Sequence, residues 1–242
     1  MIKFYFNHAP NPVKVALMLE ETGLPYEPVP VDTRKGEQFT PAFMALNPNA
    51  KVPVIVDGDA TVFDSNAIVL YLAEKSGQFL PENTPAARGA MLSWLMFVAS
   101  GVGPFSGQYV HFKNFAPDPK AYAVNRYGVE ARRHYGILND RLAKHPYMLG
   151  DSYGVVDMAV WGWARLVPFV LGDEAFAGLP HLKRLVDEID QRPAAQRLAA
   201  LRMWIWWFPN VKVKVGIAGH DDVYRLRQIR KRLGWNMDMR LD

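Results

Sequence analysis

Two motifs decide the fold of this chain: Lys-Val-Pro-Val-Ile-Val-Asp at residues 51–57 and Phe-Asp-Ser-Asn-Ala at residues 63–67. Pro53 lies at the start of an apolar strand, and because proline cannot donate a ladder hydrogen bond, the backbone before it stays free to pair with a peptide. Ser65 is predicted as the N-cap of the next helix, beside the acid Asp64, and the positive end of a helix suits a carboxylate. Each motif alone is common as a purely structural feature. Together they predict a site for a small peptide with a free amine and a free carboxylate.

The residues around these motifs predict alternating strands and helices. Apolar and polar residues alternate over residues 2–6, which indicates a half-buried strand. A helix is expected from Val13 to Thr22, with Pro12 in its first turn and Gly23 closing it. Further strands are expected at Tyr26–Val31, Val54–Asp57 and Thr61–Phe63. Residues 1–80 are therefore predicted to form an α/β domain of the thioredoxin-like type.

Beyond a linker at residues 81–86, the pattern changes to long helices. Residues 87–204 are predicted to form an all-helical domain, and residues 205–242 a basic, Trp-rich extension. Asp157 stands three residues after Gly154, where an acid favours the first turn of a helix that glycine caps only weakly. The expected helices span residues 86–112, 121–144, 155–167, 181–191 and 194–201.

Composition excludes several classes of protein. The 242 residues include no Cys, which rules out disulfide scaffolds, thiolate zinc sites and a cysteine nucleophile, so any thiol chemistry has to come from a ligand. The most hydrophobic patch, residues 203–208, is too short to span a bilayer, which takes roughly 20 residues. The N-terminal residues lack the long apolar run and the small-residue cleavage site of a signal peptide, so export is not expected. A soluble, cytoplasmic protein with no membrane partner is expected.

Positive charge is concentrated at the end of the chain. Residues 205–242 carry a net charge of +4, equal to that of the whole chain, so residues 1–204 are neutral overall. Such a segment is able to contact nucleic acid, an anionic membrane or an acidic surface. A solvated helix face or a contact with an acidic surface or substrate is the preferred interpretation, and nucleic acid is not expected as a partner.

The order and spacing of Val52-Pro53 and Asp64-Ser65 resemble those of the cytosolic glutathione transferases, and the resemblance extends over residues 1–204. Within that family the sequence is similar to the bacterial Nu class and the Ure2-like proteins. The resemblance implies the glutathione transferase fold, in which an α/β thioredoxin-like domain precedes an all-α domain. It also implies glutathione as co-substrate, no metal, and a homodimer. The similarity to the Nu class rests on Ala9–Asn11 and on residues 36–39, 63–67 and 101–108.

The resemblance makes Asn11 the candidate catalytic residue. The thiol pKa of glutathione is about 8.5, so only a few per cent is thiolate at pH 7 and an enzyme must stabilise the anion. In the Nu class a Thr or Ser two residues before an Asn assists the sulfur, whereas this chain has Ala9. Asn11 remains, because its amide donates a hydrogen bond to a thiolate without losing a proton. Judged from the residues alone, Asn11 is also typical of a turn. Of the other residues nearby, Tyr5 is expected to face the core or the sheet, and His8 is a minor candidate for a base.

The resemblance also implies a glutathione site. Val52, before a Pro53 expected in the cis form, presents its backbone N–H and C=O to the cysteinyl unit. Asp64 pairs with the γ-glutamyl amine, and Ser65 binds the α-carboxylate. Gln38 and Lys51 are predicted to contact the glycyl end, although Lys51 is alternatively a solvated charge. Arg133, with the adjacent Arg132, is predicted to bind a carboxylate of glutathione or of a second glutathione. A surface salt bridge with Glu130 or with a partner chain is the alternative role for the two arginines.

An acceptor pocket is expected between the two domains, lined by aromatic side chains, although aromatics at this spacing are also typical of a packed core. The candidates are Phe105, Tyr109, His111, Phe112 and Trp163.

The predicted function is glutathione-dependent. Bound glutathione thiolate attacks an electrophilic carbon of a small hydrophobic molecule, as in a transferase, or a disulfide, as in a disulfide-bond oxidoreductase. Because the chain has no Cys, disulfide exchange would proceed through two bound glutathiones. Two alternatives stay open: a non-catalytic interaction or regulatory module of the same fold, and a lyase that cleaves an ether or thioether.

Overall fold

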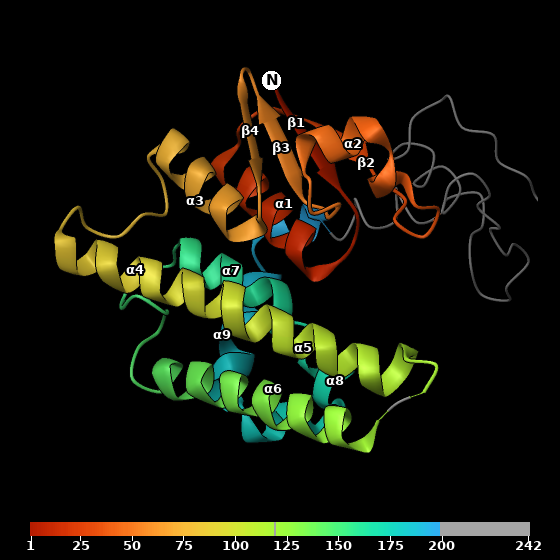
Figure 1. Cartoon of the computed structure of the whole chain (residues 1–242). Coiled ribbons are helices and arrows are strands. Elements are labelled where there is room, and N and C mark those ends of the chain that lie inside the picture. The colour runs from red at the N-terminus through yellow and green to blue at the C-terminus, as the bar shows by residue number, and fades with distance from the viewer. Residues whose placement is uncertain (119, 199–242) are drawn as a thin grey trace, which may run out of the picture. The chain divides into compact units, whose positions relative to one another are not determined.

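A mixed four-stranded sheet forms the N-terminal domain, with the strand order β2-β1-β3-β4 (Figure 1). The structure is a computed structural model, and it describes residues 1–118 and 120–198. β1 runs parallel to β2 and antiparallel to β3, which in turn pairs antiparallel with β4. The strands are β1 (Ile2–Phe6), β2 (Tyr26–Pro30), β3 (Val54–Asp57) and β4 (Ala60–Phe63).

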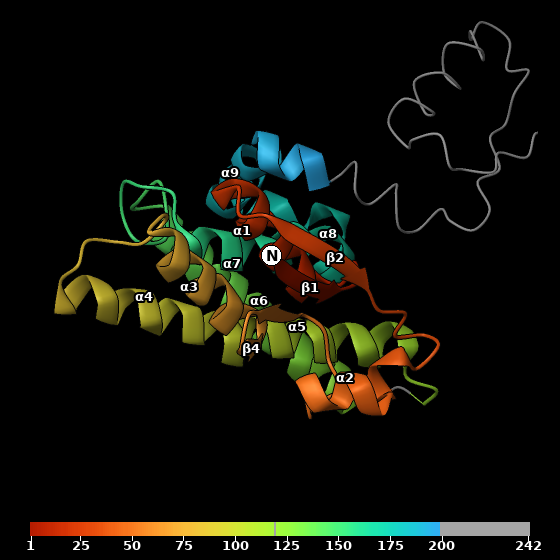
Figure 2. The same ribbon diagram turned by 90° about the horizontal axis from the view of Figure 1, so that it is seen from above.

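The two faces of this sheet are covered by different helices. The even-numbered side chains of β1, which include Phe4, are buried. Helix α1 (Pro10–Thr22) packs against helix α3 (Ser65–Ser76). Because strand side chains alternate between faces, Tyr5 points the other way. Its ring contacts Phe43 of α2 (Pro41–Leu46) edge to face at 6.1 Å, and α2 lies on that side of the sheet (Figure 2). The prediction that Tyr5 has a packing role is confirmed.

Helix α1 begins earlier than the sequence pattern indicates. Val13 was the expected first residue, but the helix starts at Pro10, because a proline fits the first helical position where its missing N–H is not needed. Asn11 therefore lies in the first turn of α1 and not in a loop. The predicted end is confirmed, since Gly23 takes the left-handed conformation and donates its N–H to Leu19 O.

The helical domain opens with one continuous run over Pro85–Phe115, made of α4 (Pro85–Phe97), the π-helix η2 (Val98–Val102), α5 (Gly103–Val110) and the π-helix η3 (His111–Phe115). Residues 193–198 are also helical. The short helices α2 and α8 (Val167–Leu171) were not predicted, because they are too short to show a period. The remaining elements are the 3₁₀ turn η1 (Glu37–Phe39), α6 (Ala121–Leu142), α7 (Val155–Ala164), α8 (Val167–Leu171), the 3₁₀ turn η4 (Asp173–Gly178) and α9 (Pro180–Asp190).

The run Pro85–Phe115 is long and apolar enough to cross a membrane by length and composition alone, which the sequence analysis did not anticipate. Its buried side chains include Met91, Leu95 and Val102, and the run packs on α6 and α7. Core packing within the helical domain therefore accounts for part of its apolar character, while apolar side chains such as Met96 and Phe115 stay exposed.

Asp157 caps the N-terminus of α7, and its side chain is fully buried. Oδ1 accepts a hydrogen bond from Met148 N at 2.8 Å, and Oδ2 accepts one from Gly154 N at 2.9 Å. Burial raises the pKa of Asp157 to about 7. Glycine suits position 154 because a Cβ there would lie 3.0 Å from the carbonyl oxygen of Phe79, which is a tight contact. The capping role predicted for Asp157 is confirmed.

The domain boundaries stay a proposal. α3 ends at Ser76 and α4 begins at Pro85, so the predicted linker at residues 81–86 overlaps both the connection and the first helical turn. The proposed extension at residues 205–242 lies outside the described residues.

Candidate functional site

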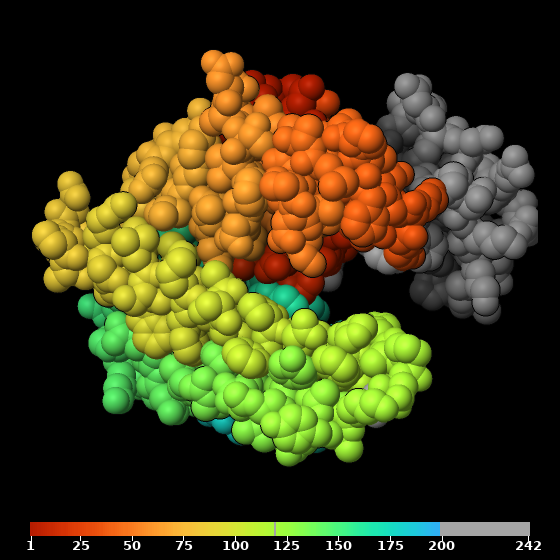
Figure 3. Space-filling model, in the orientation of Figure 1, coloured from red at the N-terminus to blue at the C-terminus, as the bar shows by residue number. Residues whose placement is uncertain are grey.

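A hollow opens between the sheet domain, drawn in orange, and the lime-green end of the helical run (Figure 3). Red atoms from the beginning of the chain and teal atoms of the helical domain lie at its back. The sheet domain meets the helical domain mainly where α1 packs directly on α7, and α3 also contacts α7.

Asn11 and Trp163 meet across the two domains. Trp163 Nε1 on α7 donates a hydrogen bond to Asn11 Oδ1 at 2.9 Å. An indole N–H is only a donor, so the amide oxygen has to face Trp163 and the amide NH₂ has to point away from it. Trp163 was predicted to line an acceptor pocket, and its contact with Asn11 was not predicted because the two residues are 152 positions apart.

Gly162 allows α7 to approach the beginning of α1. A Cβ at position 162 would lie 2.9 Å from Pro10 O and 3.0 Å from Lys14 Cβ, which is closer than real Cβ contacts allow. A side chain at this position would therefore separate the two helices, and with them Asn11 from its partner on α7.

We expect Gly162→Ala to lower the free energy of unfolding by about 1–3 kcal/mol, because the added methyl group overpacks this helix contact. The matched control is Gly136→Ala in α6, where a Cβ meets nothing within 4 Å. That change should leave the free energy unchanged or raise it by up to about 1 kcal/mol, since alanine favours a helix. Urea unfolding of both variants measures the difference, and equal values would show that the α1–α7 contact tolerates a side chain.

The peptide bond between Val52 and Pro53 is cis, as the resemblance implied. Within the described parts of the chain, the N–H and C=O of Val52 have no backbone hydrogen-bond partner. Val52 precedes β3, so these groups lie at the end of a strand and are available to an extended peptide.

The N-cap of α3 is Asp64 and not Ser65, so this prediction was wrong. Asp64 adopts a left-handed backbone with φ 70°, and its Oδ1 accepts hydrogen bonds from Asn66 N at 2.8 Å and Ala67 N at 3.2 Å. Ser65 is the first residue of the helix and is buried. The carboxylate of Asp64 thus uses one oxygen for the helix, and its second oxygen and the backbone N–H of Ser65 are left for a ligand.

Lys14 on α1 and Asn66 at the start of α3 form a hydrogen-bond network that extends to α4. Lys14 is 1% exposed, and its Nζ donates to Asn66 Oδ1 at 2.9 Å. Asn66 Nδ2 donates in turn to Leu95 O at 3.3 Å. Burial lowers the pKa of Lys14 to about 7, against the opposing attraction of Asp64. The network fixes the position of Asn66, and so of the residues beside it.

Gln38 and Lys51 differ in their surroundings. Gln38 is buried, and its Nε2 donates to Thr33 O at 3.3 Å. Its Oε1 has no hydrogen-bond partner among the described residues, so this oxygen is an acceptor that a peptide N–H would satisfy. The Lys51 side chain is exposed, and its carbonyl oxygen accepts a hydrogen bond from Asn47 Nδ2 at 2.7 Å.

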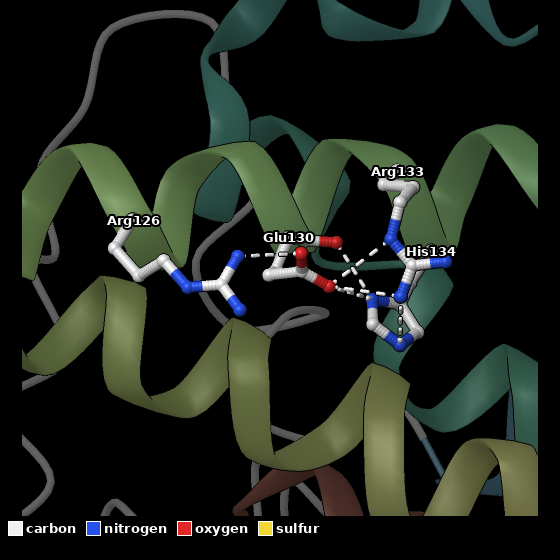
Figure 4. A network of polar contacts seen from close by, with 4 residues as sticks. All are labelled: Arg126, Glu130, Arg133 and His134. Carbon is white, nitrogen blue, oxygen red and sulfur yellow. Dashed lines mark hydrogen bonds and ion pairs between the residues drawn. The ribbon is translucent and has the colours of Figure 1, made fainter.

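The two predicted arginines lie apart from Asn11, on α6, which packs on the side of α4 and α5 away from the sheet (Figure 1). Figure 4 shows Arg133 and Arg126 on either side of Glu130, with N–O distances of 2.8 and 2.7 Å. Arg133 first and then Arg126 lower the pKa of Glu130. Arg132 instead lies over the ring of Tyr109, with its Cζ 5.8 Å from the centroid. Glutathione binding by Arg132 or Arg133 stays a prediction, and the predicted alternative, a pair with Glu130, is present for Arg133.

The other aromatic candidates pack mainly on α6. Phe105 stacks on His134 with ring centroids 5.1 Å apart, and Phe112 stacks on Tyr127 at 5.5 Å. Tyr109 is buried, whereas His111 is exposed. Helix packing therefore accounts for Phe105, Tyr109 and Phe112, and their place in an acceptor pocket stays a prediction.

A separate cavity of about 550 Å³ lies on the helical domain, beside Arg132 and the segment from Leu171 to Ala175. It includes none of the predicted glutathione contacts except Arg132. Among the described residues, no group of three or more His, Cys, Asp or Glu side chains is placed to hold a metal ion.

A thioredoxin-like domain with a cis-proline before its third strand, followed by a helical domain, defines a protein of the glutathione transferase fold class. Family models for the N-terminal and C-terminal domains of glutathione S-transferase match residues 2–74 and 121–205. The chain belongs to the glutathione S-transferase family and is an enzyme of that kind, which confirms the resemblance.

Three relatives illustrate this membership. The disulfide-bond oxidoreductase YfcG of Escherichia coli (strain K12) is 41% identical, over 80% of this chain and 92% of that protein. A glutathione transferase family member from Pseudomonas fluorescens, crystallised with two glutathione bound, is 36% identical with a TM-score of 0.76, over 81% of this chain and 91% of that one. A glutathione transferase from Pseudomonas putida, with one glutathione disulfide bound per subunit, is 35% identical with a TM-score of 0.75, and the match covers 81% of this chain and 89% of that one.

Proposed function

We propose that this enzyme binds glutathione and uses its thiolate to reduce disulfides, with Asn11 as the group that stabilises the sulfur. The observation that carries the proposal is the orientation of Asn11, whose amide oxygen is held by Trp163 and whose NH₂ is turned away as a donor. A fixed donor aimed at a developing or existing anion stabilises it more than water does, because the donor does not have to reorient.

The free polar groups around the sheet support glutathione as the ligand. The backbone of Val52 suits the cysteinyl unit, and the second oxygen of Asp64 suits the γ-glutamyl amine. Ser65 offers a hydroxyl and a backbone N–H to the α-carboxylate, while Gln38 Oε1 and exposed Lys51 suit the glycyl end. The relatives crystallised with glutathione or its disulfide support the same assignment.

The proposed chemistry is two successive thiol–disulfide exchanges. A glutathione thiolate attacks one sulfur of the substrate disulfide, which releases a substrate thiolate and leaves a mixed disulfide. A second glutathione thiolate then attacks the glutathione sulfur of the mixed disulfide and releases the other substrate thiolate. Two glutathiones are oxidised to glutathione disulfide, and one substrate disulfide is reduced. The similarity to YfcG, named a disulfide-bond oxidoreductase, favours this reaction over attack on carbon or ether cleavage.

Calorimetry with millimolar glutathione and a coupled assay of disulfide reduction test the proposal. Ser65→Ala should weaken glutathione binding by about tenfold, which is the usual contribution of a hydrogen bond to a charged group. Ser76→Ala, at the other end of α3, is the matched control and should bind like the wild type. Absence of binding heat for the wild type would contradict the proposal, and binding without turnover would favour a non-catalytic module.

We also propose a homodimer in the cytoplasm, as in the family resemblance. Arg133 and Arg132 are proposed to reach a glutathione carboxylate from α6. Because α6 packs away from the sheet domain in this chain, such a contact would be made most directly to a glutathione on a second copy (Figure 1).

A further inference from the structure

We infer that Trp163 is a positioning residue: it locks the side-chain amide of Asn11 so that NH₂, and not oxygen, meets the sulfur of bound glutathione. The inference rests on the proposed function, and it adds a residue of the helical domain to a site otherwise built from the thioredoxin-like domain.

The need for such a lock follows from the chemistry of asparagine. A terminal amide presents an oxygen on one side and an NH₂ on the other, and the two are almost equal in size. The oxygen would repel a thiolate, whereas the NH₂ donates to it. Asn11 is half-buried, and its Oδ1 accepts the Trp163 N–H at 2.9 Å. Rotating the amide would place NH₂ against the indole N–H and leave two donors facing each other.

The indole itself is held in a slot on α5. A Cβ at Gly103 would lie 3.1 Å from Trp163 Nε1, and a Cβ at Gly107 would lie 3.5 Å from its Cη2. These two glycines are four residues apart and therefore lie on one face of the helix. Gly103 and Gly107 of the motif at residues 101–108 thus leave room for the ring of Trp163.

Helix α7 provides a matched control for this contact. Trp161 lies two residues before Trp163, and its Nε1 donates to Asp190 Oδ1 at 2.8 Å. Replacing either tryptophan by phenylalanine removes one indole N–H from the same helix. Only Trp163→Phe releases the amide of Asn11.

The experiment measures the pKa of the glutathione thiol in the complex, from the pH dependence of thiolate absorbance and of kcat/KM. Trp163→Phe should raise this pKa by about 1 unit, the size expected for losing one well-oriented hydrogen bond to the charged form. Binding of S-methylglutathione, which has no ionisable thiol, should change by less than about twofold. Trp161→Phe should leave the thiol pKa at the wild-type value.

Asn11→Asp tests the orientation with Trp163 intact. The carboxylate still accepts the indole N–H, but it places a second oxygen where the NH₂ was, so the thiol pKa should rise at least as far as in Trp163→Phe. In an Asn11→Ala background, Trp163→Phe should cause no further rise, because the group it positions is gone.

Equal thiol pKa values in Trp163→Phe, Trp161→Phe and the wild type would overturn the inference while leaving the proposed function in place. If Trp163→Phe does not fold, a wild-type thiol pKa in Asn11→Asp would overturn it instead. A wild type that binds no glutathione would remove both the proposed function and this inference.

Discussion

Asn11→Ala is expected to lower kcat/KM for glutathione-dependent disulfide reduction by about 100-fold, because removing one fixed donor from an anion site typically costs two to three orders of magnitude. The loss should appear mainly in the pH range where the wild type already holds glutathione as thiolate. At pH 9 and above the difference should shrink, because free glutathione is itself largely ionised above its pKa of about 8.5.

The affinity for glutathione separates this effect from a general loss of the site. The predicted binding groups at Val52, Asp64 and Ser65 do not include Asn11, so calorimetry should find a dissociation constant within about threefold of the wild type. Asn125→Ala, an exposed position on α6, serves as the control for asparagine replacement in a helix. Full activity in Asn11→Ala would show that another group stabilises the sulfur.

The second large effect concerns stability. Asp157→Ala should lower the free energy of unfolding by about 3 kcal/mol or more, because the buried N–H groups of Met148 and Gly154 both lose their acceptor. Asp151→Ala, an exposed aspartate in the same segment, should change it by less than about 0.5 kcal/mol. Urea unfolding of the two variants gives the comparison, and similar midpoints would argue against a capping role.

The same carboxyl makes a pH-dependent contribution with a defined sign. Burial raises the pKa of Asp157 from the ordinary 3.8 to about 7, so the folded chain holds this proton more tightly than the unfolded chain does. Its contribution to stability is therefore fully present below about pH 4 and is lost as the pH rises through about 7. Asp157→Asn should remove this slope from the pH profile of unfolding, and an unchanged slope would assign it to other groups.

Much of the thioredoxin-like domain was predictable because its signals are local. The alternation at residues 2–6, the apolar run at Val54–Asp57 and Gly23 each describe the backbone within a few residues of themselves. The residue that caps α3 could not be predicted from local sequence signals. Asp64 and Ser65 are both good caps, and the choice between them depends on the positive φ of Asp64 at the junction of β4 and α3.

Residue periodicity, motif spacing and composition are properties of the chain alone, so they were enough to predict the two-domain fold class, the family and the absence of a cysteine nucleophile. The direction in which the Asn11 amide faces, and its contact with Trp163, are set by the tertiary structure. These depend on the packing of α7 on α1 and of an indole on the glycines of α5, between residues as far as 152 positions apart. No local pattern encodes the angle at which two distant helices meet, so the direction of a donor at their contact is fixed only when the domains pack.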